Sequence, residues 1–566
     1  MNVLAGAASV SYSLGFRVMT DGAIARDSGQ IALGVVLVAV LFSLGWLLSI
    51  VSSSESSLLT DRVNLALGMR IASLAARTTT LEHFERPELL ARLEQLTSNR
   101  RTLAGSPSQL FRLLGQAVRA ILTVVLLATV YLPLIIVPLL ALAPALAQRR
   151  AARIEQDSDN ALADDRRLLD DLFSLATSAA SARELRTYGV TTAITERHAV
   201  LVEHVRRRAV RSSLREAAWE GAGWLIFAAG LVAAIVILVL RAAHGHVSPG
   251  SVVMAVSLLR RAQSQISSST DTAGTFNTAR LAAGQLLWLE DHSRGLTAAG
   301  AAEPPQRLAR GIRIEGVEFA YPGSDQTRVL GPLELELPAG RCIALVGENG
   351  AGKTTLVKLL CGLYRPTAGR VMVDGVDLAE LDTEAWRASL SATFQDFVRF
   401  QLPLRESVGV GDLSHIDDHD HVRAALGRAG SAQLEADLPE GLRTAVGTRY
   451  TGGRELSGGQ WQRIALARGL MRVAPLLVVL DEPAASLDVP TETAIFDRYA
   501  SAARAAGEAN GTITLIVSHR FSTVRSADLI VVLDEGRVRE QGTHAELIAA
   551  GGTYAELYAL QARAYA

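Results

Sequence analysis

Two glycine-rich segments, about a hundred residues apart, constrain this chain more than any other feature. The first, Gly347 to Thr355, reads Gly-Glu-Asn-Gly-Ala-Gly-Lys-Thr-Thr and fits the pattern G-x-x-x-x-G-K-[ST]. In that pattern the glycines let backbone N–H groups close around phosphates, while a lysine and a hydroxyl serve the phosphates and Mg²⁺. The second segment, Leu456 to Gln460, reads Leu-Ser-Gly-Gly-Gln. Alone, the first segment predicts only a phosphate-binding strand, loop and helix.

Lysine is almost absent from the chain. Lys353 and Lys358 are the only two lysines, and arginine supplies the other basic residues. A lysine at the phosphate position of so arginine-rich a chain indicates a need for a compact ammonium rather than a planar guanidinium. The sequence predicts no role for Lys358.

The order of motifs after the second segment points to one family. Trp461-Gln462-Arg463 follows directly, and an apolar run from Leu476 to Leu480 then ends in Asp481-Glu482-Pro483. This order resembles the ATP-binding cassette (ABC) family, closely in the C-terminal half and loosely in the N-terminal half. The alternating segment Ile312 to Tyr321, with strands and helices following in βα order, supports a parallel α/β core.

The resemblance implies ATP and Mg²⁺ as cofactors and assigns each motif a role. The ATP-contacting residues would be Tyr321, Gly347, Asn349, Gly350, Gly352, Lys353, Thr354, Thr355, Ser457, Gly459, Gln460 and Asp488. The catalytic residues would be Glu482, His519 and Gln395, and the metal-binding residues Thr354, Gln395 and Asp481. Any one of these would be unremarkable alone, so the order and spacing of the set carry the assignment. One position departs from the family pattern, because Ala484 stands where a hydroxyl is common.

Within this set, Glu482 is the candidate base, and Tyr321 would stack on adenine, as aromatic rings do with any base. Ser457 and Gly459 would touch the γ-phosphate bound on an opposite subunit, since two cassettes of the family dock head to tail. The resemblance therefore implies a dimer.

The N-terminal half predicts a membrane domain. Of all residues 49% are apolar, and Ile31 to Val51 contains no charge over about the length that crosses a bilayer. We predict six helices, at about 1–20, 30–52, 110–131, 132–147, 221–241 and 249–267. The first contains Arg17 but lacks the basic start of a secretory signal, which favours a transmembrane helix.

Two charged stretches, Ser52 to Gln109 and Gln148 to Glu220, have leucine and alanine at helical spacing. Arginines gather at their membrane ends, whereas the presumed outer loops carry only Arg26 and Arg241, so the stretches are predicted to extend into the cytosol. Breaks at 84–87 and 185–189 are predicted to be turns that contact the cassette. The predicted fold is an all-α six-helix transmembrane domain with long cytosolic extensions (1–291), a linker (292–306) and an α/β P-loop cassette (307–566).

Composition excludes several other classes. The net charge of −1 and the lack of a basic arm give no case for nucleic-acid binding. The only two cysteines, Cys342 and Cys361, flank the P-loop region and indicate core residues in a reducing cytosol rather than a disulfide framework. Ile31 to Val51 and Ala222 to Leu240 exclude a soluble ABC protein.

The order of membrane half then cassette resembles ABC exporters. Segments 394–397 and 456–468 look most like bacterial exporters of lantibiotic-type peptides, here lacking a peptidase domain, so a leader peptide would be removed elsewhere. The resemblance implies an ATP-hydrolysing homodimer in the bacterial inner membrane, with its cassette in the cytoplasm, that exports a ribosomally made peptide by alternating access. A lipid or drug exporter of the same architecture is the alternative. An ATP-gated channel or receptor is more remote, since Glu482 favours turnover.

Two further patterns leave open alternatives. Arg112, Gln116 and Arg119 share one helical face, as do Arg260, Ser264, Ser267 and Asp271, so two polar stripes are predicted to line an aqueous cavity. Arginines that extend to the cytosolic surface, or that pair with carboxylates of the cytosolic helix extensions, are an equally supported alternative.

The other pattern is the segment 415–421, His-Ile-Asp-Asp-His-Asp-His, which has the composition of a metal site. The sequence favours an exposed, capped helix start there.

Overall fold

The computed structural model describes residues 1–77, 80–81, 86–140, 142–296, 300–322, 328–482, 507–518 and 524–565. These residues form two compact units. The first comprises Met1–Ile71 and Gln95–Leu286, and the second comprises Ala72–Glu94 and Leu287–Ala566. The second unit therefore joins the cassette to a short part of the first charged stretch.

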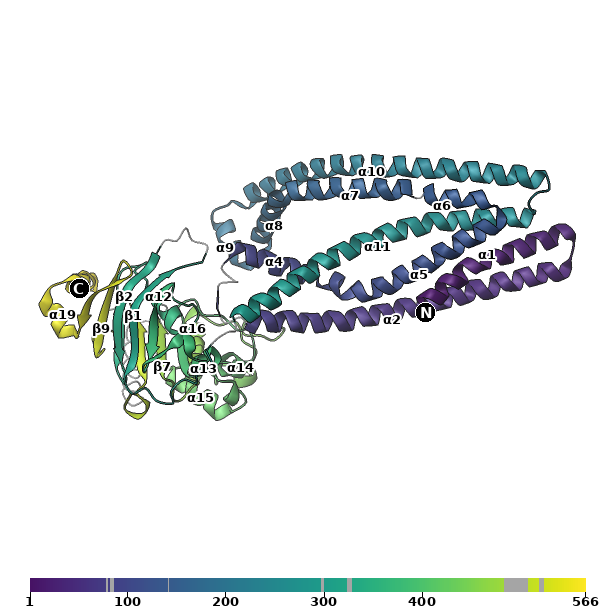
Figure 1. The fold of residues 1–566 in the computed structure, drawn as a ribbon. Coiled ribbons are helices and arrows are strands. Elements are labelled where there is room, and N and C mark those ends of the chain that lie inside the picture. Colours follow the sequence, from purple (N-terminus) through teal and green to yellow (C-terminus); the bar gives the residue numbers. More distant parts are fainter. Residues whose placement is uncertain are drawn as a thin grey trace. The chain divides into compact units, whose positions relative to one another are not determined.

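The N-terminal half consists of long helices (Figure 1). Their bounds are α1 Asn2–Ala25, α2 Ser28–Arg77, α4 Pro87–Ser98, α5 Arg100–Val130, η1 Leu132–Ile135, α6 Ile136–Leu140, α7 Leu142–Ala161, α8 Ala163–Thr177, α9 Ala179–Thr187, α10 Thr191–Ala243 and α11 Pro249–Leu296. In the first unit, α10 packs along α7, and α1 packs along α5. The predicted extensions are confirmed, because α2 and α10 each continue without a break from apolar into charged sequence.

Four of the described helices are long and apolar enough to cross a membrane, at Ser28–Ala76, Arg100–Val130, Leu132–Ala161 and Thr191–Ala243. The other two predicted spans, 1–20 and 249–267, fall within α1 and α11. Neither of those helices meets the same test of length and hydropathy over the residues described. The count of six spans therefore stays a prediction.

Small residues let α1 and α2 approach closely. A Cβ on Gly15 would lie 2.7 Å from Val38 Cγ2, and a Cβ on Gly34 would lie 2.5 Å from the backbone nitrogen of Met19. Membrane helices have no hydrophobic drive to associate, so such close backbone contact is a main source of their packing energy. Between the helices, Asp27 accepts hydrogen bonds from the first backbone N–H groups of α2. The α1–α2 pair is thus a helical hairpin with a capped turn.

The cassette contains two sheets. Strands β3 (Cys342–Val346), β6 (Leu390–Thr393), β7 (Leu477–Asp481), β8 (Ile513–Val517), β9 (Leu529–Asp534) and β10 (Arg537–Gly542) form a six-stranded sheet in the order β10-β9-β3-β8-β7-β6. All its neighbours are parallel except β10, which is antiparallel at one edge. Strands β1 (Gly311–Ala320), β2 (Arg328–Pro338), β4 (Ala368–Val373) and β5 (Val376–Asp377) form an antiparallel sheet in the order β2-β1-β4-β5.

Both faces of the parallel sheet are buried, which explains its continuous apolar strands. Along β3, Ile343 and Leu345 join one core cluster, while Ala344 and Val346 join another. The helical and 3-10 elements of the cassette are α12 Lys353–Leu360, η2 Leu378–Glu380, α13 Thr383–Ala388, α14 Leu404–Gly409, η3 Leu413–His415, α15 His419–Arg428, η4 Ala432–Leu434, η5 Gly441–Arg443, α16 Gly458–Gly469, α19 His544–Ala550 and α20 Thr553–Tyr565. The predicted α/β P-loop fold is confirmed.

Candidate functional site

Four adjacent parallel strands bring the predicted ATP-site motifs to one edge of the sheet. The strands lie in the order β3, β8, β7 and β6. The P-loop follows β3, Gln395 follows β6, and Asp481 ends β7 with Glu482 next. Ligands of open parallel sheets bind beyond the carboxyl ends of the strands. The fold therefore gathers residues from distant parts of the sequence at one site.

The P-loop has the backbone that its glycines predict. A Cβ on Gly347, where φ is 151°, would lie 2.1 Å from the carbonyl oxygen of Leu533, so no larger residue fits there. Gly350, with φ of 87°, has open space where its Cβ would be. The Nζ atom of Lys353 donates hydrogen bonds of 2.8 Å to the carbonyls of Gly347 and Glu348. The ammonium is thus already inside the loop that phosphates would enter.

A pocket of about 640 Å³ lies at this edge. Eight of the predicted site residues line it: Asn349, Gly350, Gly352, Lys353, Thr354, Thr355, Gln395 and Glu482. The pocket combines a helix N-terminus, a buried ammonium and a carboxylate, which is the combination that phosphate chemistry requires. These residues form the candidate site for the ATP phosphates.

Glu482 and Gln395 are held together. The Nε2 atom of Gln395 donates a hydrogen bond of 2.9 Å to Oε2 of Glu482, and the backbone N–H of Glu482 donates to the carbonyl of Val517 at 3.0 Å. Glu482 also has a φ of 46°, a left-handed conformation that costs free energy for any residue except glycine. This backbone turns the carboxylate away from the buried strand and into the pocket.

Asp481 is a buried carboxylate, 1% exposed. Its two oxygens have no hydrogen-bond partner of good geometry among the described residues. Burial, with repulsion from Glu482, raises the pKa of Asp481 to about 6, although the Thr354 hydroxyl offsets part of that rise. A buried, unsatisfied carboxylate beside a P-loop hydroxyl fits the oxygen ligands that Mg²⁺ takes. Burial also lowers the pKa of the Lys353 ammonium, and attraction from Glu482 and Asp481 counters this effect.

The predicted adenine-stacking residue, Tyr321, follows β1. Its hydroxyl lies 3.0 Å from Oγ1 of Thr355, a pocket residue, but Tyr321 itself is not among the described residues that line the pocket. Phe319 and Tyr364 contact its ring edge-on, and the Lys358 ammonium lies 5.3 Å from its centroid. The second lysine of the chain therefore has a contact that the sequence did not predict, a cation–π interaction.

The second glycine-rich segment forms the N-terminus of α16. Ser457 caps the helix, accepting a hydrogen bond from the Gln460 N–H, while the Gln460 side chain accepts one from the Ser457 N–H. Ser457 is exposed. Within the described part of the cassette, Ser457, Gly459 and Gln460 do not line the P-loop pocket. Two further predicted residues, Asp488 and His519, lie outside the described residues.

Sequence reasoning missed some residues of this region. Val329 and Val517 line the pocket, and the only signal for Val517 is its place at the end of an apolar strand. Arg468, near the end of α16, donates from Nε to the Ser407 carbonyl at 3.0 Å and from Nη1 to the Val398 carbonyl at 3.1 Å. Burial lowers its pKa to about 10. We call the second glycine-rich segment, Leu456 to Gln460, the signature, and α16, which begins in it, the signature helix. Arg468 thus ties the signature helix to the segment that follows Gln395.

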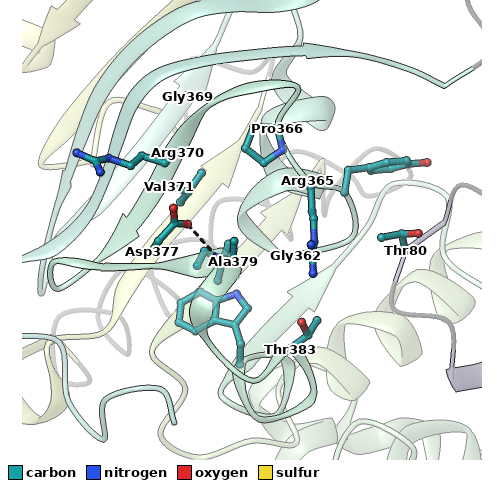
Figure 2. A pocket seen from close by; sticks show the side chains of 13 residues that line it. Thr80, Gly362, Arg365, Pro366, Gly369, Arg370, Val371, Asp377, Ala379 and Thr383 are labelled. Carbon is teal, nitrogen blue, oxygen red and sulfur yellow. Dashed lines mark hydrogen bonds between the residues drawn. The ribbon is translucent and has the colours of Figure 1, made fainter. Parts of the chain in front are cut away.

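A second pocket of the cassette, about 170 Å³, includes a residue from the first charged stretch. Figure 2 shows Thr80 on the opposite side of this pocket from Arg370 and Asp377. Next to it, the Leu81 N–H donates to the Leu363 carbonyl at 3.2 Å, and the Leu81 side chain packs against the cassette core. Of the predicted turn at 84–87, the first two residues lie outside the described residues and Pro87 begins α4, while the chain at Leu81 contacts the cassette core.

The first unit contains a polar cavity of about 350 Å³ between α1, α2 and α5. Arg112 and Arg119, two members of the predicted stripe, line it with Asn2 and several serines of α2. Gln116, the third member, is buried instead and points Nε2 toward Thr272 Oγ1 at 3.5 Å. Arg260 is exposed and does not line this cavity, and the side chains at 264, 267 and 271 lie outside the described residues.

Known proteins give the same architecture. Residues 330–485 match the family model described as ABC transporter. A solved structure of a bacterial Atm1-family ABC exporter with ATP bound superposes with a TM-score of 0.75 at 25% identity, over 99% of this chain and 97% of that one. An ATP-dependent lipid A-core flippase of Chromohalobacter salexigens is 31% identical over 75% of this chain and 70% of the relative.

Two other relatives agree. The ATP-dependent lipid A-core flippase of Chromobacterium violaceum is 34% identical over 68% of this chain and 64% of its own length. The ABC multidrug transporter MDR1 of Cryptococcus neoformans var. grubii is 38% identical over 44% of this chain and 17% of its own. With its helical membrane half and P-loop cassette, the chain belongs to the ABC transporter family and is an ATP-hydrolysing, multi-pass exporter half-transporter.

Proposed function

We propose that this chain exports an amphipathic molecule with an anionic head group, of the lipid type, across the inner membrane of a bacterium. The observation that carries the proposal is the cavity with Arg112 and Arg119. Ser49, Ser52 and Ser53 also line it, which places the cavity at the end of the charge-free run Ile31 to Val51. That is the cytosolic end in the predicted topology, where a head group of the inner leaflet would enter.

The chemistry of the cavity suits a phosphate or carboxylate head group. A guanidinium binds such groups with two parallel hydrogen bonds, and the serine hydroxyls supply further donors. Charged residues at membrane depth are costly and mark functional sites by default. The Nε of Arg119 is buried and has no hydrogen-bond partner among the described residues, so this side chain has an unsatisfied donor.

The peptide substrate predicted from segments 394–397 and 456–468 has less support. The relatives are named lipid A-core flippases and a multidrug transporter, and these names favour the lipid or drug alternative. The cassette motifs on which the peptide prediction rested serve ATP chemistry, which every exporter shares. We therefore take the lipid-type substrate as the main proposal.

The working form is proposed to be a homodimer with two shared ATP sites. Ser457 and Gly459 lie at an exposed helix N-terminus, which is suited to an anion, yet they do not line the P-loop pocket within the described residues of their own chain. The site of one chain is completed if the signature of a second copy faces it. Since this chain carries both Glu482 and the signature, no different partner is needed.

In the proposed hydrolysis, the P-loop amides and Lys353 bind and orient the phosphates. Thr354, Gln395 and Asp481 would hold Mg²⁺, which when bound neutralises phosphate charge. Glu482, oriented by Gln395, positions the attacking water and accepts its proton, and His519 would contact the γ-phosphate. Closing of the two cassettes around ATP and their separation after hydrolysis would drive the membrane domain between inward-facing and outward-facing forms. The contact of Leu81 with Leu363 is one path for that coupling.

The test is substrate-stimulated ATPase activity of the full chain in nanodiscs. We expect an anionic amphiphile such as phosphatidic acid to stimulate turnover, and an uncharged diacylglycerol of the same acyl chains to stimulate it less. Stimulation by a cationic peptide but by no lipid would overturn the lipid-type substrate and restore the peptide.

A further inference from the structure

Three potential metal ligands converge in the cassette, away from the ATP site. They are Asp412, before the 3-10 turn η3, His415, at its end, and His421, in the first turn of α15. One ligand atom of each lies within 4.8 Å of those of the other two. The sequence favoured an ordinary helix start here, and Asp418 does cap α15. The folding of 412–421 into a turn nevertheless brings two imidazoles and a carboxylate together.

His421 is oriented as metal-binding histidines are. Its Nε2 lies 2.6 Å from the carbonyl oxygen of Met471. A carbonyl only accepts hydrogen bonds, so Nε2 carries a proton, and in the neutral form of the ring Nδ1 is the nitrogen with the lone pair. Ligating histidines usually donate their other N–H to a carbonyl or carboxylate in this way, which fixes the tautomer and the ring. The His421 backbone N–H donates to Asp418 at 3.1 Å, which fixes the backbone too.

Asp412 and His415 form the other side of the cluster. Nδ1 of His415 lies 2.9 Å from Oδ2 of Asp412, and the Ser414 hydroxyl donates to Oδ1 at 2.6 Å. A carboxylate oxygen beside imidazole nitrogens is a donor that a zinc-type ion accepts. Asp412 is the less exposed of the pair, with 20% of its side chain accessible against 47% for His415.

The distances allow a tetrahedral ion once one of the two imidazole rings turns. Ligand atoms bound at 2.0 to 2.1 Å in tetrahedral geometry lie about 3.3 Å apart. The rings of His415 and His421 are stacked, with centroids 4.5 Å apart and planes inclined by 15°. An ion cannot lie in both of two nearly parallel planes, so His415, half exposed and held only by local contacts, must turn out of the stack. His421 stays in place because Met471 holds it.

We propose that Asp412, His415 and His421 form a binding site for a divalent transition metal of the zinc type, with water as the fourth ligand. Two imidazoles and one carboxylate are a ligand set that suits Zn²⁺ and leaves one position open. The site would connect η3 and α15 to Met471, which lies just beyond the end of the signature helix α16. Metal binding would thus fix the C-terminal end of α16. The N-terminus of the same helix is the part proposed above to contact the ATP bound by the other subunit.

The experiment measures Zn²⁺ itself on the full chain in detergent, with any affinity tag removed. Equilibrium dialysis against ZnCl₂ should find one cluster-dependent ion per chain. His415→Gln and Asp412→Asn should each weaken that binding by at least about 10- to 100-fold, the range typical for loss of a residue that only supports a metal ligand. His419→Gln is the matched control, because His419 is an exposed histidine of the same helix outside the cluster. It should bind as wild type does.

Two further measurements secure the result. Co²⁺ bound in place of Zn²⁺ should give the visible absorption of a tetrahedral ion, and His421→Gln should abolish it. Basal Mg²⁺-ATPase activity without added zinc should be unchanged in His415→Gln, which shows that this variant folds. The proposed site would be overturned if wild type bound no Zn²⁺ at a free Zn²⁺ concentration about 100-fold above the micromolar range. Equal Zn²⁺ binding by wild type and His415→Gln would overturn it as well.

Discussion

Gln395 donates a hydrogen bond of 2.9 Å from Nε2 to Oε2 of Glu482, and this contact joins the ends of β6 and β7. The two residues are 87 positions apart in the sequence. The amide orients the carboxylate, so Glu482 presents a positioned oxygen at the phosphate pocket.

The first prediction concerns that carboxylate. Glu482→Gln should keep ATP binding but lower steady-state ATPase activity at least about 100-fold, which corresponds to roughly 2.7 kcal/mol of lost transition-state stabilisation. The amide has the same shape but cannot accept the proton of water. Glu535→Gln is the control, since Glu535 is exposed, also has a positive φ of 45°, and lies outside the P-loop pocket. Turnover within about threefold of wild type, under about 1 kcal/mol, would remove Glu482 from the role of base.

The shared site predicts complementation between two inactive variants. Ser457→Ala disables the signature, and Lys353→Ala disables the P-loop. A mixed dimer of the two keeps one site in which wild-type Lys353 faces wild-type Ser457, so partial ATPase activity should return on mixing. Subunit exchange is followed by fluorescence transfer between labelled chains. Exchange without any recovered activity would contradict independent shared sites.

The polar cavity predicts a split between basal and stimulated activity. Arg112→Ala with Arg119→Ala should lower stimulation by an anionic amphiphile at least about 10-fold, because each lost bidentate contact costs on the order of 1.4 kcal/mol. Basal ATPase activity should persist, since the cavity lies in the other unit. Arg260→Ala is the matched control, an exposed arginine that does not line the cavity. If the double variant responds to substrate as wild type does, the cavity is not the substrate site.

Asp481 predicts a pH dependence of stability in the absence of Mg²⁺ and ATP. Between its usual pKa and the folded value of about 6, the folded cassette keeps a proton that the unfolded chain has lost. Raising the pH through this window therefore lowers the free energy of unfolding. Asp481→Asn removes the burial of charge, so the variant should be more stable than wild type at pH 7.5 by about 2 to 3 kcal/mol.

That advantage of Asp481→Asn should shrink as the pH falls through the folded value of about 6, and it should be lost below the usual pKa of 3.8, where Asp481 is protonated in both states. Thermal unfolding of the purified full chain at several pH values, in the presence of a chelator, measures the difference. The same variant should lose Mg²⁺-dependent ATPase activity. A constant difference across the pH range would show that Asp481 does not titrate in this window.

Sequence reasoning predicted the cassette well because its motifs are local. The P-loop, the signature and Asp481-Glu482 each depend on a few consecutive residues, and a parallel sheet places their ends together. The fold class and the long helical extensions are confirmed. The convergence of Asp412, His415 and His421 was not predictable, because it depends on a turn whose geometry hydropathy does not encode. The edge-on contacts of Phe319 and Tyr364 with Tyr321, and the contact of Lys358 with its ring, likewise depend on packing.

The membrane half shows a different limit. A helix pattern gives length and burial tendency, but two arginines on one face predict a cavity only if a neighbouring helix leaves space there. Arg112 and Arg119 meet such a space because Gly6 and Gly45, small residues of α1 and α2, line it with serines. Arg260 shows the same local pattern and lies at the surface. The substrate class depends on such tertiary detail, and the family motifs of the cassette carry no information on it.

The capping box at Ser457 has a kinetic consequence. Because Ser457 and Gln460 satisfy each other's backbone N–H groups within one chain, the signature loop is already ordered before a second cassette arrives. Docking onto ATP then loses little conformational freedom on this side of the interface, which favours a fast closing step. The speed of the transport cycle would accordingly depend on how quickly the closed dimer reopens, and a substitution that loosens the cap, such as Gln460→Ala, would slow closing first.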